Sequence, residues 1–258
     1  MMKKKYFFFD IDGTLTHKET REIVPSALTA LRLLQENGHF VAIATGRAHY
    51  KAIHFMKTIG LKNMVCNGGH GLVVNEQLID NVPLDFQKSL AILQQAQQLG
   101  YGVLIAPFDS EDVYGQDFLF LKQAGFRKEP TTYYIDPQYQ FSQFQNIYKM
   151  YISIPQDQEN KLTLKETVGH LRFEKEYLMF QPDNKQQGIM HMMQYLQADP
   201  HDVVVFGDDY NDIDMFSGDW YSIAMGNACD ELKRIANEVT EKNVDDGIYK
   251  ACVRHGWI

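Results

Sequence analysis

The stretch Tyr6-Phe7-Phe8-Phe9-Asp10-Ile11-Asp12-Gly13-Thr14-Leu15-Thr16 decides the fold of this chain. Its four consecutive aromatic residues predict a strand that is buried on both faces, as in a parallel sheet. Two carboxylates follow, and an unpaired buried carboxylate costs several kcal/mol, so the pair needs a partner. A hard cation such as Mg²⁺ is the simplest one, because it takes oxygen ligands. Strand alternation predicts Asp10 and Asp12 on the same side, and Gly13 allows a sharp turn after them.

This stretch has two other interpretations. An ordinary turn after a strand is one of them, since Asp and Gly are common in turns. A calcium-binding loop also opens with Asp-x-Asp, but its sixth position is Gly and its twelfth is Glu. Here these positions are Leu15 and Arg21, so a calcium loop is excluded.

The composition is that of an ordinary globular protein: 258 residues, 45% hydrophobic and 22% charged. The net charge of −8 argues against nucleic acid or an anionic membrane as the main partner. Three widely spaced cysteines indicate buried free thiols rather than disulfides or a zinc cluster. The apolar run after the basic Met1–Lys5 segment is too short for a signal peptide, and no run approaches the ~20 residues of a membrane span. We therefore expect a cytoplasmic enzyme.

The first part of the chain alternates strands and helices. Residues 26–37 and 48–59 have the pattern of helices that end at Gly38 and Gly60, while 40–44 and 64–66 are short apolar runs typical of strands. A hairpin follows over 72–79. This alternation predicts a Rossmann-like parallel α/β sheet.

The pattern changes between residues 83 and 182. Here we expect helices over 86–99 and 117–124, and strands over 103–106, up to Ile154 and over 177–180. Strands and helices without regular alternation predict a second, smaller α+β domain.

From Lys185 the α/β pattern returns, with helices to Gln197 and over 229–236 and 245–255, and strands over 202–206 and 221–224. We therefore predict an α/β catalytic core made of residues 1–82 and 183–258, with residues 83–182 as an inserted α+β cap domain.

Three predicted strands end in polar clusters: Asp10 and Asp12, then Thr45, then Asp208 and Asp212. In an open parallel sheet, ligands bind outside the carboxyl ends of the strands. The carboxylates offer oxygens to Mg²⁺, and Thr45 with Gly46 offers a hydroxyl and an amide to a phosphoryl group. Phosphoryl transfer is largely positioning and electrostatic stabilisation, and a carboxylate can act as its nucleophile.

These patterns resemble the four ordered motifs of the haloacid dehalogenase (HAD) superfamily. The matching residues are Asp10-Ile-Asp12-Gly-Thr14, Thr45-Gly46-Arg47, Lys185 within Asn184–Gly188, and Gly207-Asp208-Asp209-Tyr210-Asn211-Asp212. An insertion between the second and third motifs resembles members with a type 2 cap, the Cof-type phosphatases. The segments Ala224–Ala228 and Asp245–Gly247 are similar to C-terminal signatures of that subgroup.

The resemblance implies a role for each matching residue. Asp10 would be the nucleophile and a metal ligand, and Asp12 the general acid and base with its backbone carbonyl on the metal. Thr45 would bind the phosphoryl group and Lys185 would neutralise it. Asp208 would bind Mg²⁺. Asp212 would bind it or orient a ligand, and Asn211 would bind phosphate or hold the loop.

Several other polar residues are candidates either for substrate contact or for the surface. Gly46 and Arg47 are expected at the substrate, although Arg47 could equally lie on the surface. Asn67, after the strand at 64–66, is a candidate for leaving-group contact. We expect Asp209 to be a solvated turn residue. Arg127 and Lys128 could bind a substrate anion, but we expect them to lie in a solvated loop.

The sequence thus predicts a Mg²⁺-dependent phosphatase of small phosphorylated metabolites, either sugar phosphates or a phosphorylated cofactor, which works through an aspartyl-phosphate. A phosphomutase and a non-catalytic metabolite-binding regulator are the alternatives. The expected partner is a small phosphate ester, with neither nucleic acid nor membrane. Whether the protein is a monomer or a dimer stays open.

Overall fold

The computed structural model describes residues 3–258, and its chain forms two compact units. The core unit ends its first part at Asn81 and resumes over Asn184–Ile258, and the inserted unit spans Val82–Asp183. None of the helices within residues 3–258 is long and apolar enough to span a membrane.

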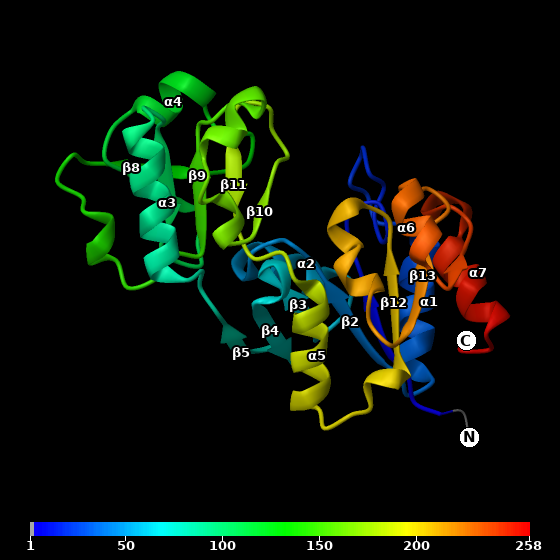
Figure 1. Ribbon diagram of the computed structural model, residues 1–258. Coiled ribbons are helices and arrows are strands. Elements are labelled where there is room, and N and C mark those ends of the chain that lie inside the picture. Colours follow the sequence, from blue (N-terminus) through cyan, green and yellow to red (C-terminus); the bar gives the residue numbers. More distant parts are fainter. Residues whose placement is uncertain (1–2) are drawn as a thin grey trace. The chain divides into compact units, whose positions relative to one another are not determined.

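The core unit is built on an eight-stranded sheet with the order β14-β13-β12-β1-β2-β3-β4-β5 (Figure 1). Strand β1 pairs in parallel with β12 and β2, so that Phe8 is aligned with Val205 and Ala42. Strands β4 and β5 are antiparallel additions at one edge. The strands of this sheet are β1 (Tyr6–Phe9), β2 (Phe40–Ala44), β3 (Met64–Cys66), β4 (Gly71–Val74), β5 (Gln77–Asn81), β12 (Val203–Gly207), β13 (Tyr221–Ala224) and β14 (Glu238–Val239).

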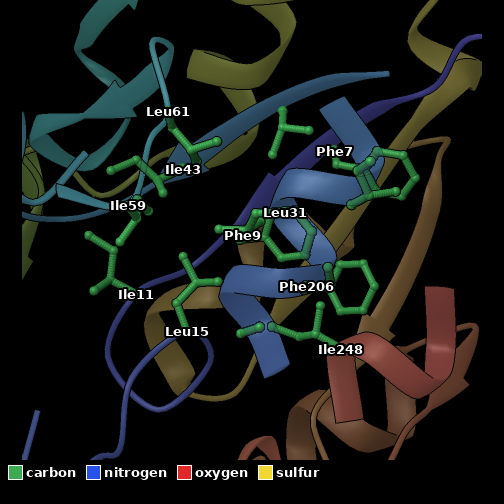
Figure 2. Packing of buried hydrophobic residues seen from close by; sticks show 14 of the residues in the cluster. Phe7, Phe9, Ile11, Leu15, Leu31, Ile43, Ile59, Leu61, Phe206 and Ile248 are labelled. Carbon is green, nitrogen blue, oxygen red and sulfur yellow. The ribbon is translucent and has the colours of Figure 1, made fainter. Parts of the chain in front are cut away.

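Helices cover both faces of this sheet, and the side chains of β1 alternate between them. Phe7 and Phe9 pack in one cluster with residues of α1, α2 and α7, and Figure 2 shows Phe9 beside Leu31. Phe8 faces the opposite layer, formed by α5 and α6. The predicted α/β fold class is therefore confirmed. The helices are α1 (Pro25–Glu36), α2 (His49–Thr58), α5 (Lys185–Tyr195), α6 (Asp230–Ile235) and α7 (Gly247–Arg254).

The inserted unit has a six-stranded sheet with the order β10-β11-β9-β6-β7-β8, in which only β7 and β8 pair in parallel. Helix α3 packs Ile92 and Leu93 into one hydrophobic cluster, and α4 packs Phe120 into a second. This is an α+β arrangement. Its elements are α3 (Phe86–Gln98), β6 (Val103–Ala106), β7 (Asp112–Gly115), α4 (Leu119–Ala124), β8 (Thr132–Ile135), β9 (Lys149–Ile152), β10 (His170–Leu171) and β11 (Leu178–Phe180).

The expectation that Arg127 lies in a solvated loop is wrong. Only 8% of its side chain is exposed, and its guanidinium carbon lies 4.0 Å from the centre of the Tyr151 ring. Stacking on an aromatic face is favourable for a weakly hydrated guanidinium, so Arg127 is part of the packing of the inserted unit. Lys128 is exposed as expected and pairs with Glu174 at 2.6 Å.

Candidate active site

The first site residues follow the central strand. Strand β1 ends at Phe9, and the amide of Asp10 still donates to the carbonyl of Phe206 at 3.0 Å. The Asp10 side chain is buried, whereas that of Asp12 is exposed. Strand β1 ends before both residues, and the expectation that the two side chains face the same side stays a prediction.

Three buried carboxylates meet at the carboxyl ends of β1 and β12. Asp10, Asp208 and Asp212 each place an oxygen within 4.8 Å of the others. Because β1 and β12 are parallel neighbours, the residues after them lie at the same edge of the sheet. Three acids this close and this deeply buried require positive charge nearby.

Lys185 supplies one positive charge. Its side chain is fully buried, and Nζ lies 2.7 Å from Asp10 Oδ1 and 2.6 Å from Asp212 Oδ1. Burial disfavours the charged amine, but the carboxylates of Asp10 and Asp212 outweigh it and raise the pKa of Lys185. Lys185 is therefore a protonated cation between two acids.

Glycines allow α5 to bring Lys185 this close. The N-terminus of α5 lies directly on the turn Asn67–Gly69, where the amide of Asn184 donates to the carbonyl of Gly68 at 2.7 Å. A Cβ on Gly69 would overlap the carbonyl of Asn184, and a Cβ on Gly188 would overlap Val65. The spacing Lys185-Gln-Gln-Gly188 thus places glycine where the helix touches the sheet.

The oxygens of Asp212 and Asp208 are used differently. Asp212 Oδ2 accepts from the amides of Asp208 at 2.9 Å and Asp209 at 3.1 Å, so both Asp212 oxygens are bonded. Asp208 Oδ1 accepts from Thr14 Oγ1 at 3.0 Å, but Oδ2 is buried without a hydrogen-bond donor among residues 3–258. A buried carboxylate oxygen left open in this way fits a cation ligand.

The acids also have perturbed proton affinities. Burial, followed by the charge of Asp212, raises the pKa of Asp10 to about 8 against the opposing effect of Lys185. The same two causes raise the pKa of Asp208 to about 7. A bound divalent cation would favour the ionised forms, and the three carboxylates could hold such an ion.

Asp209 lies at a turn with 36% of its side chain exposed, as expected, but it also has specific partners. It is the N-cap of the 3₁₀ turn Tyr210–Asp212, where its Oδ1 accepts from the amide of Tyr210 at 2.9 Å. Its Oδ2 lies 2.7 Å from Lys18 Nζ, which is also 3.8 Å from Asp208 Oδ2. Lys18 was missed because a lysine in a loop usually lies on the surface, and nothing local marks its partner.

The second motif lies at the end of β2, next to β1. Thr45 is buried, its amide donates to the Val65 carbonyl at 2.9 Å, and its Oγ1 accepts from the Arg47 amide at 3.2 Å. The hydroxyl hydrogen therefore remains to donate to a ligand. Half-buried Gly46 follows it. Arg47 binds both oxygens of Asp12, with Nε at 3.0 Å and Nη2 at 2.5 Å.

Asn67 and Asn211, the two asparagines predicted to contact the substrate, lie in two separate turns of the core unit. Asn67 is buried, and its Nδ2 donates to Asn81 Oδ1 at 3.3 Å. Its own Oδ1 is a buried acceptor without a donor among the described residues. Asn211 is half-buried in the turn Tyr210–Asp212. Their roles at a substrate stay predictions.

Buried Asp10 after β1, the lysine that contacts it and the acidic cluster after the adjacent β12 thus lie together at one edge of the sheet. The family model of haloacid dehalogenase-like hydrolases matches residues 7–252 of this sequence. The chain belongs to this family. The resemblance seen in the motifs is thereby confirmed.

Known proteins of the family are similar along nearly the whole chain. The putative phosphatase YkrA of Bacillus subtilis (strain 168) is 28% identical over 250 residues, with 96% of both chains covered. The 5-amino-6-(5-phospho-D-ribitylamino)uracil phosphatase YwtE of the same organism is 25% identical, with 95% of both covered. The HAD subclass IIB sugar phosphatase BT4131 has a TM-score of 0.77 at 24% identity, covering 99% of this chain and 100% of its own. The HAD hydrolase described here is therefore an enzyme of the phosphatase type.

Proposed function

We propose that this HAD phosphatase is Mg²⁺-dependent and hydrolyses small phosphorylated metabolites, sugar phosphates or a phosphorylated cofactor, through an aspartyl-phosphate on Asp10. The observation that carries the proposal is the buried Asp10 side chain, which lies 2.7 Å from Lys185 Nζ and within 4.8 Å of Asp208. The similarity to phosphatases named for a phosphoribityl compound and for sugars supports the substrate class.

In the proposed first step, the Asp10 carboxylate attacks phosphorus and the bond between phosphorus and the leaving oxygen breaks. Lys185 and the Thr45 hydroxyl hold the phosphoryl oxygens, and Asp12 gives a proton to the departing alkoxide. In the second step, ionised Asp12 takes a proton from water as the water attacks phosphorus. The bond between Asp10 and phosphorus then breaks, which releases phosphate and restores Asp10.

Asp10 and Asp208 are the proposed side-chain ligands of Mg²⁺, together with the backbone carbonyl of Asp12. Asp212 orients the site instead, because its two oxygens are already bonded to Lys185 and to two amides. When bound, the ion would offset negative charge on the phosphoryl oxygens. Replacing Asp208 with alanine should abolish metal-dependent phosphate release while the protein stays folded, and full turnover of that variant in chelator would refute this assignment.

The role of Asp12 can be tested separately. Both of its oxygens are bound to Arg47, so the side chain must leave this partner to reach a substrate. Asp12→Asn keeps the size of the side chain but can neither give nor take the proton. Single-turnover alcohol release from an alkyl phosphate should fall by about 10²–10⁴-fold. Nitrophenolate release should fall less, because this leaving group needs no proton. An unchanged rate on the alkyl ester would contradict the mechanism.

A phosphomutase would use the same residues, so the products decide between the two activities. A panel of phosphate esters should be incubated with the protein and Mg²⁺ and followed by phosphorus NMR. Inorganic phosphate is the expected product, whereas an isomeric phosphate ester would indicate a mutase. Absence of any turnover, with ligand binding retained, would favour the metabolite-binding regulator.

The inserted unit is proposed to act as the cap that selects the substrate. All residues assigned to the chemistry belong to the core unit. Replacing residues 83–182 with a short linker should therefore reduce the activity on natural substrates far more than that on a small aryl phosphate. Equal losses for both would argue against a role in specificity.

A further inference from the structure

Two asparagines of the C-terminal part of the core unit bind the loop that follows β1. Asn227 lies between β13 and α6, and its Nδ2 donates to the carbonyl of Gly13 at 2.8 Å. Asn243 is buried, and its Nδ2 donates to the carbonyl of Thr16 at 2.8 Å. The loop is thus held at two carbonyls by side chains 214 and 227 residues away in the sequence.

The two asparagines are also bonded to each other. The backbone amide of Asn243 donates to Asn227 Oδ1 at 2.9 Å, so the side-chain amide of Asn227 is used at both ends. An amide offers a donor and an acceptor in one rigid plane, which a carboxylate or an alkyl group cannot. We call Asn227 and Asn243 the asparagine clamp.

The loop held by the clamp contacts Asp208. Thr14 Oγ1 donates to Asp208 Oδ1 at 3.0 Å, and a Cβ on Gly13 would overlap the Asp208 carboxyl group. The amide of Gly13 donates to the same Thr16 carbonyl that Asn243 binds, at 3.0 Å. A shift of this loop would therefore move the Thr14 hydroxyl and Gly13, the two groups that contact the Asp208 carboxylate.

The backbone of Asp208 is fixed independently of the loop. Its carbonyl accepts from the amide of Cys229 at 2.9 Å, and its amide donates to Asp212 Oδ2. The freedom that remains to Asp208 is the rotation of its carboxylate, which places the open, buried Oδ2. The contacts with Thr14 and Gly13 restrict this rotation.

We infer that Asn227 and Asn243 are positioning residues, which hold the Gly13–Thr16 loop so that Thr14 orients the Asp208 carboxylate toward a divalent cation. The inference rests on the proposed function only in taking Asp208 as a ligand of Mg²⁺. A partner bonded directly to a metal ligand, as Thr14 is to Asp208, typically contributes 10–100-fold to metal affinity, and this is the upper bound for residues that act through it. The clamp should therefore act on metal binding more than on substrate binding.

The test compares Asn227→Ala and Asn243→Ala with the control Asn237→Ala. Asn237 lies on the same C-terminal segment, and its Oδ1 accepts from the amide and hydroxyl of Ser222, away from the loop. The dissociation constant of Mg²⁺ alone is measured by calorimetric titration, beside the melting temperature and the kcat and KM for an aryl phosphate at saturating Mg²⁺. Both clamp variants should raise this constant by up to about 10–100-fold without raising KM, while the control loses only thermal stability.

Thr14→Val tests the link between the clamp and Asp208 if a clamp variant fails to fold. It nearly preserves the shape of the side chain and removes the donor to Asp208 Oδ1, so it should weaken Mg²⁺ binding to a similar degree. Wild-type Mg²⁺ affinity in the folded clamp variants or in Thr14→Val would overturn the inference. Equal weakening in Asn237→Ala would do so too, because the effect would then be general.

The failure of the proposed function would look different. If the wild-type protein releases phosphate but binds no Mg²⁺, the proposed metal dependence is wrong and the inference falls with it. If the wild-type protein binds Mg²⁺ and the variants do so equally well, the inference alone is refuted.

Discussion

Replacing Lys185 with methionine removes the cation that contacts both Asp10 and Asp212, at 2.7 and 2.6 Å. Methionine has a similar length and no charge, so the change leaves two buried carboxylates without this partner. Water cannot take its place without opening the core, because Lys185 is 0% exposed. Removing one member of a buried ion pair costs about 3–5 kcal/mol, and we expect a loss of this size in the free energy of unfolding.

The assay is urea unfolding in the presence of a chelator, followed by tryptophan fluorescence. The protein has 2 tryptophans, and both Trp220 and Trp257 are buried in the core unit, so the signal reports on the unit that contains Lys185. For a slope of about 2 kcal/mol per molar urea, a loss of about 4 kcal/mol lowers the midpoint by about 2 M. Under conditions where the variant is folded, kcat should fall by about 10²–10³-fold.

Lys18→Met is the matched control. Lys18 also pairs with an aspartate of the third polar cluster, at 2.7 Å from Asp209, but 59% of its side chain is exposed. An exposed pair contributes at most about 1 kcal/mol, so this midpoint should move little. If Lys185→Met unfolds at the same urea concentration as the wild type, or if both variants shift equally, Lys185 does not neutralise the buried acids and the reasoning is refuted.

Three further predictions follow from packing. Gly69→Ala should lower the melting temperature and phosphate release more than Gly60→Ala does. Both glycines have positive φ, but an added Cβ would meet a backbone carbonyl at Gly69 and open space at Gly60. Equal effects would exclude the close approach of α5 as the cause. Arg127→Met should destabilise the inserted unit by about 2 kcal/mol, as measured by thermal unfolding followed by circular dichroism. Tryptophan fluorescence reports on the core unit, so an equal shift in that signal would show that the effect is not confined to the inserted unit. Iodoacetamide at pH 8 should alkylate half-buried Cys229 before Cys252. Burial raises the pKa of the Cys252 thiol to about 12, so this thiol stays protonated at pH 8. The reverse order of alkylation, measured by peptide mass spectrometry, would count against the core packing.

The central strands could be predicted almost to the residue. Phe40–Ala44 is the predicted strand itself, and Val203–Gly207 differs from the prediction by one residue at each end. Both are continuous apolar runs, because helices cover both faces of the sheet. Strand β7 (Asp112–Gly115) was missed, since it is short, begins with a charged residue and gains its structure from its neighbours β6 and β8.

The gathering of Asp10, Asp208 and Asp212 could also be predicted, because parallel neighbouring strands bring their carboxyl ends together. The partners of individual side chains could not. Arg47 binds Asp12 across 35 residues, and Asn227 binds Gly13 across 214. No local periodicity encodes such pairs, since they depend on how loops from distant segments fit against each other.

The position of β1 in the middle of the sheet has a consequence for synthesis of the protein. Lys5 and Asp202, which flank the pairing of β1 with β12, are 197 residues apart. At 5–20 residues per second, the ribosome needs about 10–40 s to complete the partner strand after β1 has been made. Throughout this interval Phe7, Phe8 and Phe9 lie on an unpaired sheet edge, which is the kind of surface that aggregates. The nascent chain therefore carries this aromatic edge unpaired until β12 has been made, and Asp10 has no lysine beside it until translation has passed α5.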